Sequence, residues 1–154
     1  MSYTFEIMTQ EQAQDIAQNW RYEGEYSFYD MDADLEDLGE FLDPEKRADS
    51  YFMVFQDNKA AGFYSFAQTD KETVDIGLGM KPDLTGRGKG IVFLEAGLQF
   101  AKTNYQPQKI TLSVAAFNKR AIKLYENLGF RKVESFVQAT NGGDFDFVKM
   151  ELDM

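Results

Sequence analysis

The chain has 154 residues, a formal net charge of −10 and neither cysteine nor histidine. Its length is most simply that of one soluble domain over residues 1–154. The missing residue types exclude a disulfide, a cysteine-ligated metal and a histidine base. Any acid–base chemistry must therefore use carboxylates, tyrosine, lysine or water. The acidity argues against nucleic acid and anionic membrane as partners, and because there is neither an apolar run near ~18 residues nor a signal segment after Met1, we expect a cytoplasmic protein.

The first elements follow from the spacing of apolar residues. Residues 4–8 are typical of a short strand. Thr9 and Gln12 have the spacing of a helix capping box. The residues after them predict a helix, because apolar side chains recur at i, i+3, i+4 and i+7: Ala13, Ile16, Ala17 and Trp20.

The next segment is irregular and then helical. Residues 21–31 are rich in tyrosine and acidic residues and show no clean period. The spacing of leucine and phenylalanine then predicts a second short helix within residues 35–42, capped by Asp32 or Asp34 and ended before Pro44.

Three strands follow in the middle of the chain. Residues 51–56 and 60–68 predict a hairpin, and residues 73–80 predict a further strand. Gly77 and Gly79 weaken this last strand, and a bulge or the close approach of a ligand is the usual reason for such glycines.

The second half of the chain alternates strands and helices after a glycine-rich turn. The apolar stripe of the helix that follows the turn consists of Ile91, Leu94, Leu98 and Ala101. The later elements are a strand over 109–114, a helix capped by Asn118 and stopped by Gly129, and a hairpin of strands 130–139 and 144–152. The order of elements indicates one α/β domain around a mixed, largely antiparallel sheet.

The glycine-rich turn is the first candidate site. Residues 84–91 read Leu-Thr-Gly-Arg-Gly-Lys-Gly-Ile and lead directly into a helix. Backbone N–H groups at the positive end of a helix dipole suit a phosphate or pyrophosphate, and Arg87 and Lys89 add positive charge. The turn lacks the Gly-Lys-Ser/Thr ending of a P-loop, and its glycines alternate rather than follow G-x-G-x-x-G. By itself it is also compatible with a plain flexible connection.

Tyr125 is the second candidate. It lies on the same helical stripe as Leu124 and Leu128, where an aromatic side chain more often belongs to the core. A phenol with a pKa near ~10 is nonetheless a suitable proton donor to a leaving thiolate.

Together these two segments resemble the GNAT superfamily of acetyl-CoA-dependent N-acetyltransferases. The run from Met80 to Ile91 is similar to that family's Q/R-x-x-G-x-G/A pyrophosphate loop, and Asn118-x-x-Ala121-x-x-x-Tyr125-x-x-x-Gly129-Phe130 closely matches its second motif. The motifs occur in the family's order, joined by one helix and one strand. The resemblance covers residues 60–154, and the first fifty residues match in element order only.

The resemblance implies a fold and an activity. The fold is α/β (α+β), with a mixed, mostly antiparallel central sheet of about seven strands, flanked by about four helices and splayed between strands 4 and 5. The activity of such a single N-acetyltransferase domain is direct transfer of acetyl from acetyl-CoA to a primary amine in a ternary complex, without a metal. The missing cysteines agree with direct transfer, because the usual covalent acyl carrier is absent.

The resemblance also implies site residues. The backbone of Leu78, Gly79 and Met80 would pair with the pantetheine arm and polarise the thioester carbonyl. Asn118 would contact the carrier, and Tyr125 would protonate the departing thiolate. The amides that would cradle the pyrophosphate are those of Gly86, Arg87, Gly88, Lys89, Gly90 and Ile91.

The sequence departs from the family pattern at two positions. Thr85 stands where the loop motif expects Gln or Arg, and Ser113 stands where some relatives carry a glutamate base. Asp75, on the strand over residues 73–80 and near Glu72, is the remaining candidate for the general base. A solvated carboxylate at the strand edge, or a relay of water to bulk solvent, is an equally good interpretation.

The acceptor side is predicted from charge. Residues 23–49 contain eleven Asp or Glu against two basic residues, and in the family this segment lines the acceptor pocket. Glu23 and Glu25 with Tyr26 and Tyr29 could form an acidic, aromatic cradle for an ammonium or polyamine. The alternative is an ordinary solvated face. We expect a small cationic amine or a peptide or protein amino group as acceptor, and a homodimer is compatible with the family.

Two other functions stay open at this point. A catalytically silent acyl-CoA-binding sensor or regulatory module would bind acetyl-CoA without releasing CoASH. A nucleotide-binding domain of another kind would bind ATP or NAD instead.

Overall fold

The computed structural model describes residues 3–85 and 88–154 and confirms the expected fold. Within these residues seven strands form one sheet in the order β1-β2-β3-β4-β5-β7-β6, and every neighbouring pair is antiparallel except β4 and β5. The strands are β1 (Tyr3–Ile7), β2 (Tyr51–Gln56), β3 (Lys59–Asp70), β4 (Thr73–Met80), β5 (Lys109–Ala115), β6 (Arg131–Thr140) and β7 (Gly143–Asp153).

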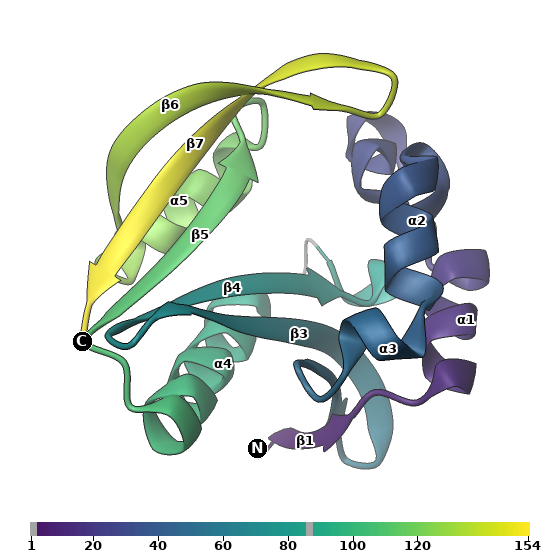
Figure 1. Ribbon diagram of the computed structural model, residues 1–154, viewed down its shortest axis with the longest axis horizontal. Coiled ribbons are helices and arrows are strands. Elements are labelled where there is room, and N and C mark those ends of the chain that lie inside the picture. The colour runs from purple at the N-terminus through teal and green to yellow at the C-terminus, as the bar shows by residue number, and fades with distance from the viewer. Residues whose placement is uncertain (1–2, 86–87) are drawn as a thin grey trace.

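Five α-helices and three 3-10 turns complete the described residues (Figure 1). They are α1 (Gln10–Asn19), η1 (Gly24–Tyr29), η2 (Met31–Ala33), α2 (Leu35–Leu42), α3 (Pro44–Arg47), η3 (Pro82–Leu84), α4 (Gly90–Tyr105) and α5 (Lys119–Asn127). None of the described helices is long and apolar enough to cross a bilayer.

The expected helix caps are confirmed. Thr9 Oγ1 accepts a hydrogen bond from the Gln12 amide at 3.1 Å, and Gln12 Oε1 accepts from the Thr9 amide at 2.9 Å, so the capping box of α1 is complete. Asp34, rather than Asp32, caps α2. Asn118 caps α5 by accepting from the amide three residues later. These caps satisfy N–H groups that have no partner inside the helix.

The sequence does not predict helix α3, because a proline such as Pro44 is typical of a helix end. Proline also suits the first turn of a helix, where an N–H group has no intrahelical partner. Asp43 caps this new helix by accepting from the Glu45 amide at 2.9 Å. The aperiodic residues before α2 form η1 and η2, whose short i to i+3 turns leave no helical period to detect.

The glycines of β4 are explained by packing against β3. The pairing register runs without a shift through Gly77 and Gly79, so the bulge considered for this strand is absent there. A Cβ at Gly79 would lie 2.5 Å from a ring carbon of Phe63, and one at Gly77 would lie 2.6 Å from Ser65 Oγ. Side chains of the neighbouring strand therefore occupy the space above both glycines.

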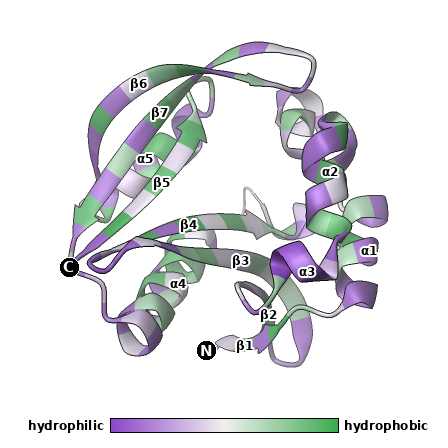
Figure 2. Cartoon of the chain, in the orientation of Figure 1, coloured by the Kyte–Doolittle hydropathy of each residue, from purple (hydrophilic) through white to green (hydrophobic). Residues whose placement is uncertain are grey.

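Two hydrophobic clusters cover opposite sides of the sheet. The larger one lies under α4 and α5 and contains the fully buried Tyr64, Phe93, Leu94, Ile110 and Met150. The smaller one lies under α1 and α2 and contains Ile16, Trp20, Phe41, Met53 and Phe63. Figure 2 shows the contrast between the hydrophobic stretches of the central strands and the hydrophilic α3.

A buried arginine joins the three N-terminal helices. Arg47 is 3% exposed. Its Nη1 donates to the Phe41 carbonyl at 2.5 Å, and its Nη2 donates to Gln10 Oε1 at 2.6 Å. No carboxylate of the described residues forms an ion pair with it. The guanidinium thus replaces missing hydrogen bonds at the end of α2 and fastens α1, α2 and α3 together.

We expect Arg47→Ala to lower the free energy of unfolding by about 2–4 kcal/mol, because it creates a cavity and leaves the Phe41 carbonyl unpaired. Lys46→Ala, on the same helix but exposed, should change stability by less than about 0.5 kcal/mol. Urea unfolding of both variants measures the difference. Equal stabilities would contradict a structural role for Arg47.

Candidate active site

The sheet opens between its two parallel strands. β4 and β5 pair over three positions only, residues 73–75 with residues 109–111. Beyond them the strands diverge (Figure 1), β4 staying paired with β3 and β5 with β7. A cleft of about 1500 Å³ opens there, lined by residues 76–80 on one side and 112–114 on the other. The expected splay is confirmed.

Backbone groups of alternate β4 residues face this cleft. The Glu72 carbonyl accepts from the Gln108 amide at 2.8 Å on the β5 side, whereas the Lys81 amide donates to the Ala61 carbonyl at 2.8 Å on the β3 side. Because backbone direction alternates along a strand, even-numbered residues of β4 point toward β5. Leu78 lies beyond the last paired position, so its amide and carbonyl point into open space.

The three predicted residues of β4 therefore differ. Leu78 and Met80 turn backbone groups toward the cleft, but Gly79 is paired with Phe63 on the β3 side. The Met80 carbonyl already has a partner, because the Tyr22 hydroxyl donates to it at 2.7 Å. Burial, and next the charge of Asp30, raise the pKa of Tyr22, which keeps this donor protonated.

Residues 22–34, here called the strap, cross the mouth of the cleft. At one end the Tyr22 amide donates to Asp30 Oδ1 at 2.8 Å, which folds the strap on itself. Further along, Asn118 Nδ2 donates to the Tyr29 hydroxyl at 3.1 Å and so joins the strap to α5. The strap is thus bonded to β4 through Tyr22 and to α5 through Tyr29.

The strap also reaches the β6–β7 turn, which extends toward it in Figure 1. Asn141 Nδ2 donates to the Phe28 carbonyl at 2.9 Å. Asp34 Oδ2 accepts from the Asn141 amide at 2.9 Å and from Thr140 Oγ1 at 3.1 Å. Hydrogen bonds from backbone amides and from Thr140 lower the pKa of Asp34, so these contacts favour its charged form.

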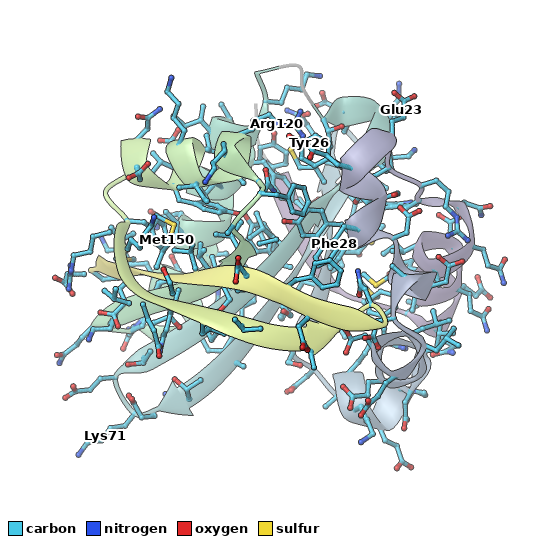
Figure 3. The ribbon with its side chains drawn as sticks, turned by 90° about the horizontal axis from the view of Figure 1, so that it is seen from above. Glu23, Tyr26, Phe28, Lys71, Arg120 and Met150 are labelled. Atoms are coloured by element: carbon cyan, nitrogen blue, oxygen red, sulfur yellow. The ribbon has the colours of Figure 1, made fainter. Side chains whose placement is uncertain are left out.

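Aromatic rings fill the space beneath the strap. Phe28 packs edge-on against Phe117 at 5.5 Å and against Phe145 at 5.0 Å. The guanidinium carbon of Arg120 lies 4.5 Å from the centre of the Tyr26 ring (Figure 3). These contacts fix the strap against both the β5–α5 loop and β7.

Tyr125 is at once a core residue and a cleft residue. It is 8% exposed, its ring packs against Phe130 at 5.8 Å, and it lines the cleft. Its hydroxyl has no hydrogen-bond partner among the described residues, and the atom is not sealed from solvent. Burial, and next the nearby Tyr29, raise the pKa of Tyr125, so the phenol stays protonated at neutral pH.

The glycine-rich turn ends at the cleft. Gly88 has φ +72° and open space around it. Gly88, Gly90 and Ile91 line the cleft at the start of α4, and Asn118 lines it from α5. Lys89 is exposed and is not among the described lining residues. The predictions for Gly86 and Arg87 lie outside the described residues.

The predicted base lies at the point where the sheet divides. Asp75 Oδ1 accepts a hydrogen bond from Thr111 Oγ1 at 2.7 Å. Burial raises the pKa of Asp75, and Thr111 and Lys149 oppose this rise. Asp75 is not among the described residues that line the cleft. Its role as base stays a prediction, and this position does not favour it.

The predicted acceptor residues all line the cleft. Glu23, Glu25, Tyr26 and Tyr29 contribute to its wall. Both glutamates are exposed, and no ion pair of either is found within residues 3–85 and 88–154. Those residues also contain no cluster of His, Cys, Asp and Glu that could hold a metal.

Sequence reasoning missed part of the cleft. Ile16, Trp20, Met31 and Phe63 line it as well, but their apolar character indicated only core. The hydrogen bond from Tyr22 to Met80 joins residues far apart in the chain, and no sequence pattern signals it.

A family model described as "Acetyltransferase (GNAT) family" matches residues 11–130. Acetyltransferase PseH of Campylobacter jejuni subsp. jejuni serotype O:23/36 (strain 81-176) is 30% identical over 80 residues, which are 52% of this chain and 50% of that protein. The match thus spans about half the length of that curated relative.

Solved structures share the fold. The crystal structure of Campylobacter jejuni N-acetyltransferase PseH has TM-score 0.69 and 22% identity, covering 99% of this chain and 98% of that one. Spermidine N-acetyltransferase from Vibrio cholerae, in complex with CoA and spermine, has TM-score 0.74 and 18% identity, with 98% and 95% covered. An aminoglycoside acetyltransferase in complex with coenzyme A has TM-score 0.74 and 19% identity, with 99% and 95% covered.

We expect Tyr22→Phe to lower the free energy of unfolding by about 1 kcal/mol, because it removes one partly buried hydrogen bond and keeps the ring. Tyr26→Phe, also on the strap, is the matched control, since no hydrogen bond of its hydroxyl is found within the described residues. Thermal or urea unfolding of both variants tests the contact. If the two variants are equally stable, the bond to Met80 does not hold the strap.

Proposed function

The chain belongs to the GNAT acetyltransferase family, and we propose that it transfers acetyl from acetyl-CoA to the primary amine of a small molecule. The observation that carries this proposal is the meeting of three parts in one cleft: the glycine turn with the start of α4, the unpaired edge of β4, and Tyr125 of α5. Members of this family use acetyl-CoA.

In this proposal the cleft holds the carrier on the α4 and α5 side of β4. The amides from Gly86 through Ile91 bind the pyrophosphate, and of these the described residues 88–91 lie at the positive end of the α4 dipole. Arg87 and Lys89 add charge from the same turn. The carrier's arm runs along β4, where Leu78 offers both an amide and a carbonyl, as an added strand would require. Asn118 approaches from the opposite wall.

Transfer then takes place in one ternary complex. The amine nitrogen attacks the thioester carbonyl carbon, the carbon–sulfur bond breaks, and Tyr125 donates a hydrogen bond to the departing sulfur. A thiol has a pKa near ~8.5, and burial raises the pKa of Tyr125 above its ordinary value, so complete proton transfer from the phenol is uphill. Tyr125 therefore acts mainly by stabilising charge on sulfur as it develops.

The proton released by the attacking amine goes to water in this proposal. Asp75 is hydrogen-bonded to Thr111 and lies off the described cleft wall, so it is a weaker candidate for this role. The exposed Glu23 and Glu25 attract cationic amines to the mouth. The strap closes the mouth against α5 and the β6–β7 turn, which favours a small acceptor over a protein.

Structural relatives support a small amine. The Vibrio cholerae protein is a spermidine N-acetyltransferase, and the second CoA-bound neighbour acts on aminoglycosides. A screen of amines, polyamines, amino acids and short peptides for acetyl-CoA-dependent thiol release tests the proposal. Binding of acetyl-CoA with no thiol release from any amine would instead support a silent acyl-CoA-binding module.

Gly88→Glu should weaken acetyl-CoA binding by about tenfold or more, because it places a carboxylate beside the pyrophosphate. Gly142→Glu is the control: Gly142 also has positive φ and open space, but it lies in the β6–β7 turn. Calorimetric titration with acetyl-CoA measures both variants. Similar affinities in the two would remove the turn from the carrier site.

Tyr125→Phe should lower kcat by about 10² while leaving the KM of acetyl-CoA nearly unchanged. Because burial raises its pKa, the phenol of the wild-type Tyr125 should remain protonated up to about pH 10. At any pH below that value, ionisation of this phenol should therefore cause no decrease in kcat. Tyr105→Phe, at the end of α4 and outside the cleft, is the control. An unchanged kcat in Tyr125→Phe would end the assignment.

A further inference from the structure

β4 divides the cleft into two unlike halves. Toward α4 and α5 the lining residues belong to the larger hydrophobic cluster and include the glycine turn. Toward α1 and η2 the apolar lining residues are Ile16, Trp20, Met31 and Phe63, all of the smaller cluster or packed against it. If the carrier occupies the first half, as proposed above, the acceptor must enter by the second.

The floor of this second half is apolar and rigid. Trp20 and Phe63 are buried, with ring centres 6.1 Å apart, and Phe63 packs against Phe41 at 5.9 Å. The Phe63 ring lies directly over Gly79, so close that a Cβ there would meet it at 2.5 Å. No charged side chain stands among these described floor residues. An ammonium placed on the floor would lose its hydration without gaining a carboxylate.

Among the described lining residues of this half, the charged side chains are exposed ones: Arg21, Glu23 and Glu25. Arg21 lines the cleft, but Asp32 lies 2.5 Å and Asp30 3.8 Å from its Nη1, so its charge is balanced. Glu23 and Glu25 are exposed, and neither has an ion pair within the described part of the chain. Figure 3 places Glu23 at the outer end of the strap. The two glutamates thus offer negative charge at the solvent side.

One part of the predicted aromatic cradle, a face of the Tyr26 ring, already has a cation against it. Arg120 covers the Tyr26 ring at 4.5 Å, so that face is not open to a ligand cation. The two glutamates at the rim and the apolar floor are further features that an acceptor can contact.

We propose that the acceptor is an amphipathic amine: a primary amine carried on an apolar chain or ring, with a second cationic group at its far end. This rests on the proposed function. The apolar part lies on the floor formed by Ile16, Trp20, Met31 and Phe63, and the distal cation lies at Glu23 and Glu25. Each methylene buried on the floor should raise kcat/KM by about fourfold.

Three matched acceptors test the proposal through thiol release at one fixed pH. Spermidine and 1,8-diaminooctane have the same number of atoms between their terminal nitrogens, but spermidine replaces one methylene by an ammonium. Octylamine keeps the chain and lacks the distal cation. We expect kcat/KM for 1,8-diaminooctane to exceed that for spermidine by about tenfold or more and that for octylamine by about three- to tenfold.

Ionisation of the acceptors does not explain this order. The inner ammonium of spermidine lowers the pKa of its terminal amines by charge repulsion, which raises the fraction of reactive free amine. If only the fraction of free amine determined kcat/KM, spermidine would therefore be the better acceptor. A higher kcat/KM for 1,8-diaminooctane thus indicates binding of its apolar chain on the floor.

Two variant pairs locate the parts of the site. Glu23→Gln with Glu25→Gln should abolish the preference for 1,8-diaminooctane over octylamine, whereas Glu36→Gln with Glu40→Gln, exposed on α2 and outside the cleft, should keep it. Met31→Glu places a carboxylate on the floor and should shift the ratio toward spermidine by about tenfold.

The outcomes are distinguishable. If kcat/KM for spermidine equals or exceeds that for 1,8-diaminooctane, the proposal that the acceptor lies on an apolar floor is wrong. Should the Glu23→Gln, Glu25→Gln variant retain the preference for 1,8-diaminooctane over octylamine, these glutamates do not bind the distal cation, and this part of the proposal is wrong. If no amine of any kind is acetylated while acetyl-CoA binds, the proposed function itself fails, and this inference fails with it.

Discussion

The parting of β4 from β5 after three paired positions is the constraint on which the rest of the structure depends. Buried backbone N–H and C=O groups need hydrogen-bond partners, and a strand edge inside a sheet exposes a row of them. Here one exposed carbonyl, that of Met80, is satisfied by Tyr22. The Leu78 backbone lies beyond the last β4–β5 pair, and in the proposed function an extended ligand pairs with it as a strand does.

The strap keeps this gap from collapsing or widening. Tyr22 bonds to β4, Tyr29 bonds to Asn118 of α5, and Asp34 bonds to the β6–β7 turn. A single short segment therefore spans both walls, and its own fold depends on the Asp30 carboxylate that receives the Tyr22 amide. Such cross-links, each modest alone, fix the width of the cleft because they act at separate places along it.

Local signals predicted the fold well, and contacts distant in sequence were beyond them. The capping residues Thr9 and Asn118 correctly predicted the starts of their helices, because a cap depends on residues only three positions away. Helix α3 was missed because a proline such as Pro44 can mark either the end of one helix or the first turn of the next. The paired motifs indicated a carrier site, but the bond from Tyr22 to Met80 and the apolar floor under Phe63 arise only when strands and helices meet.

The two sides of the cleft are built from different parts of the chain, and this has an evolutionary consequence. In the proposed function the carrier side includes the start of α4 and α5, and Phe93, Ile122 and Tyr125 of these helices also belong to the larger core, so changes there threaten folding. In the proposed function the acceptor side combines a buried floor from α1 and β3 with the strap, most of which is solvent-exposed or half-buried. Under this proposal, substrate preference in descendants of this chain can drift through exposed positions of the strap while the donor site is inherited intact.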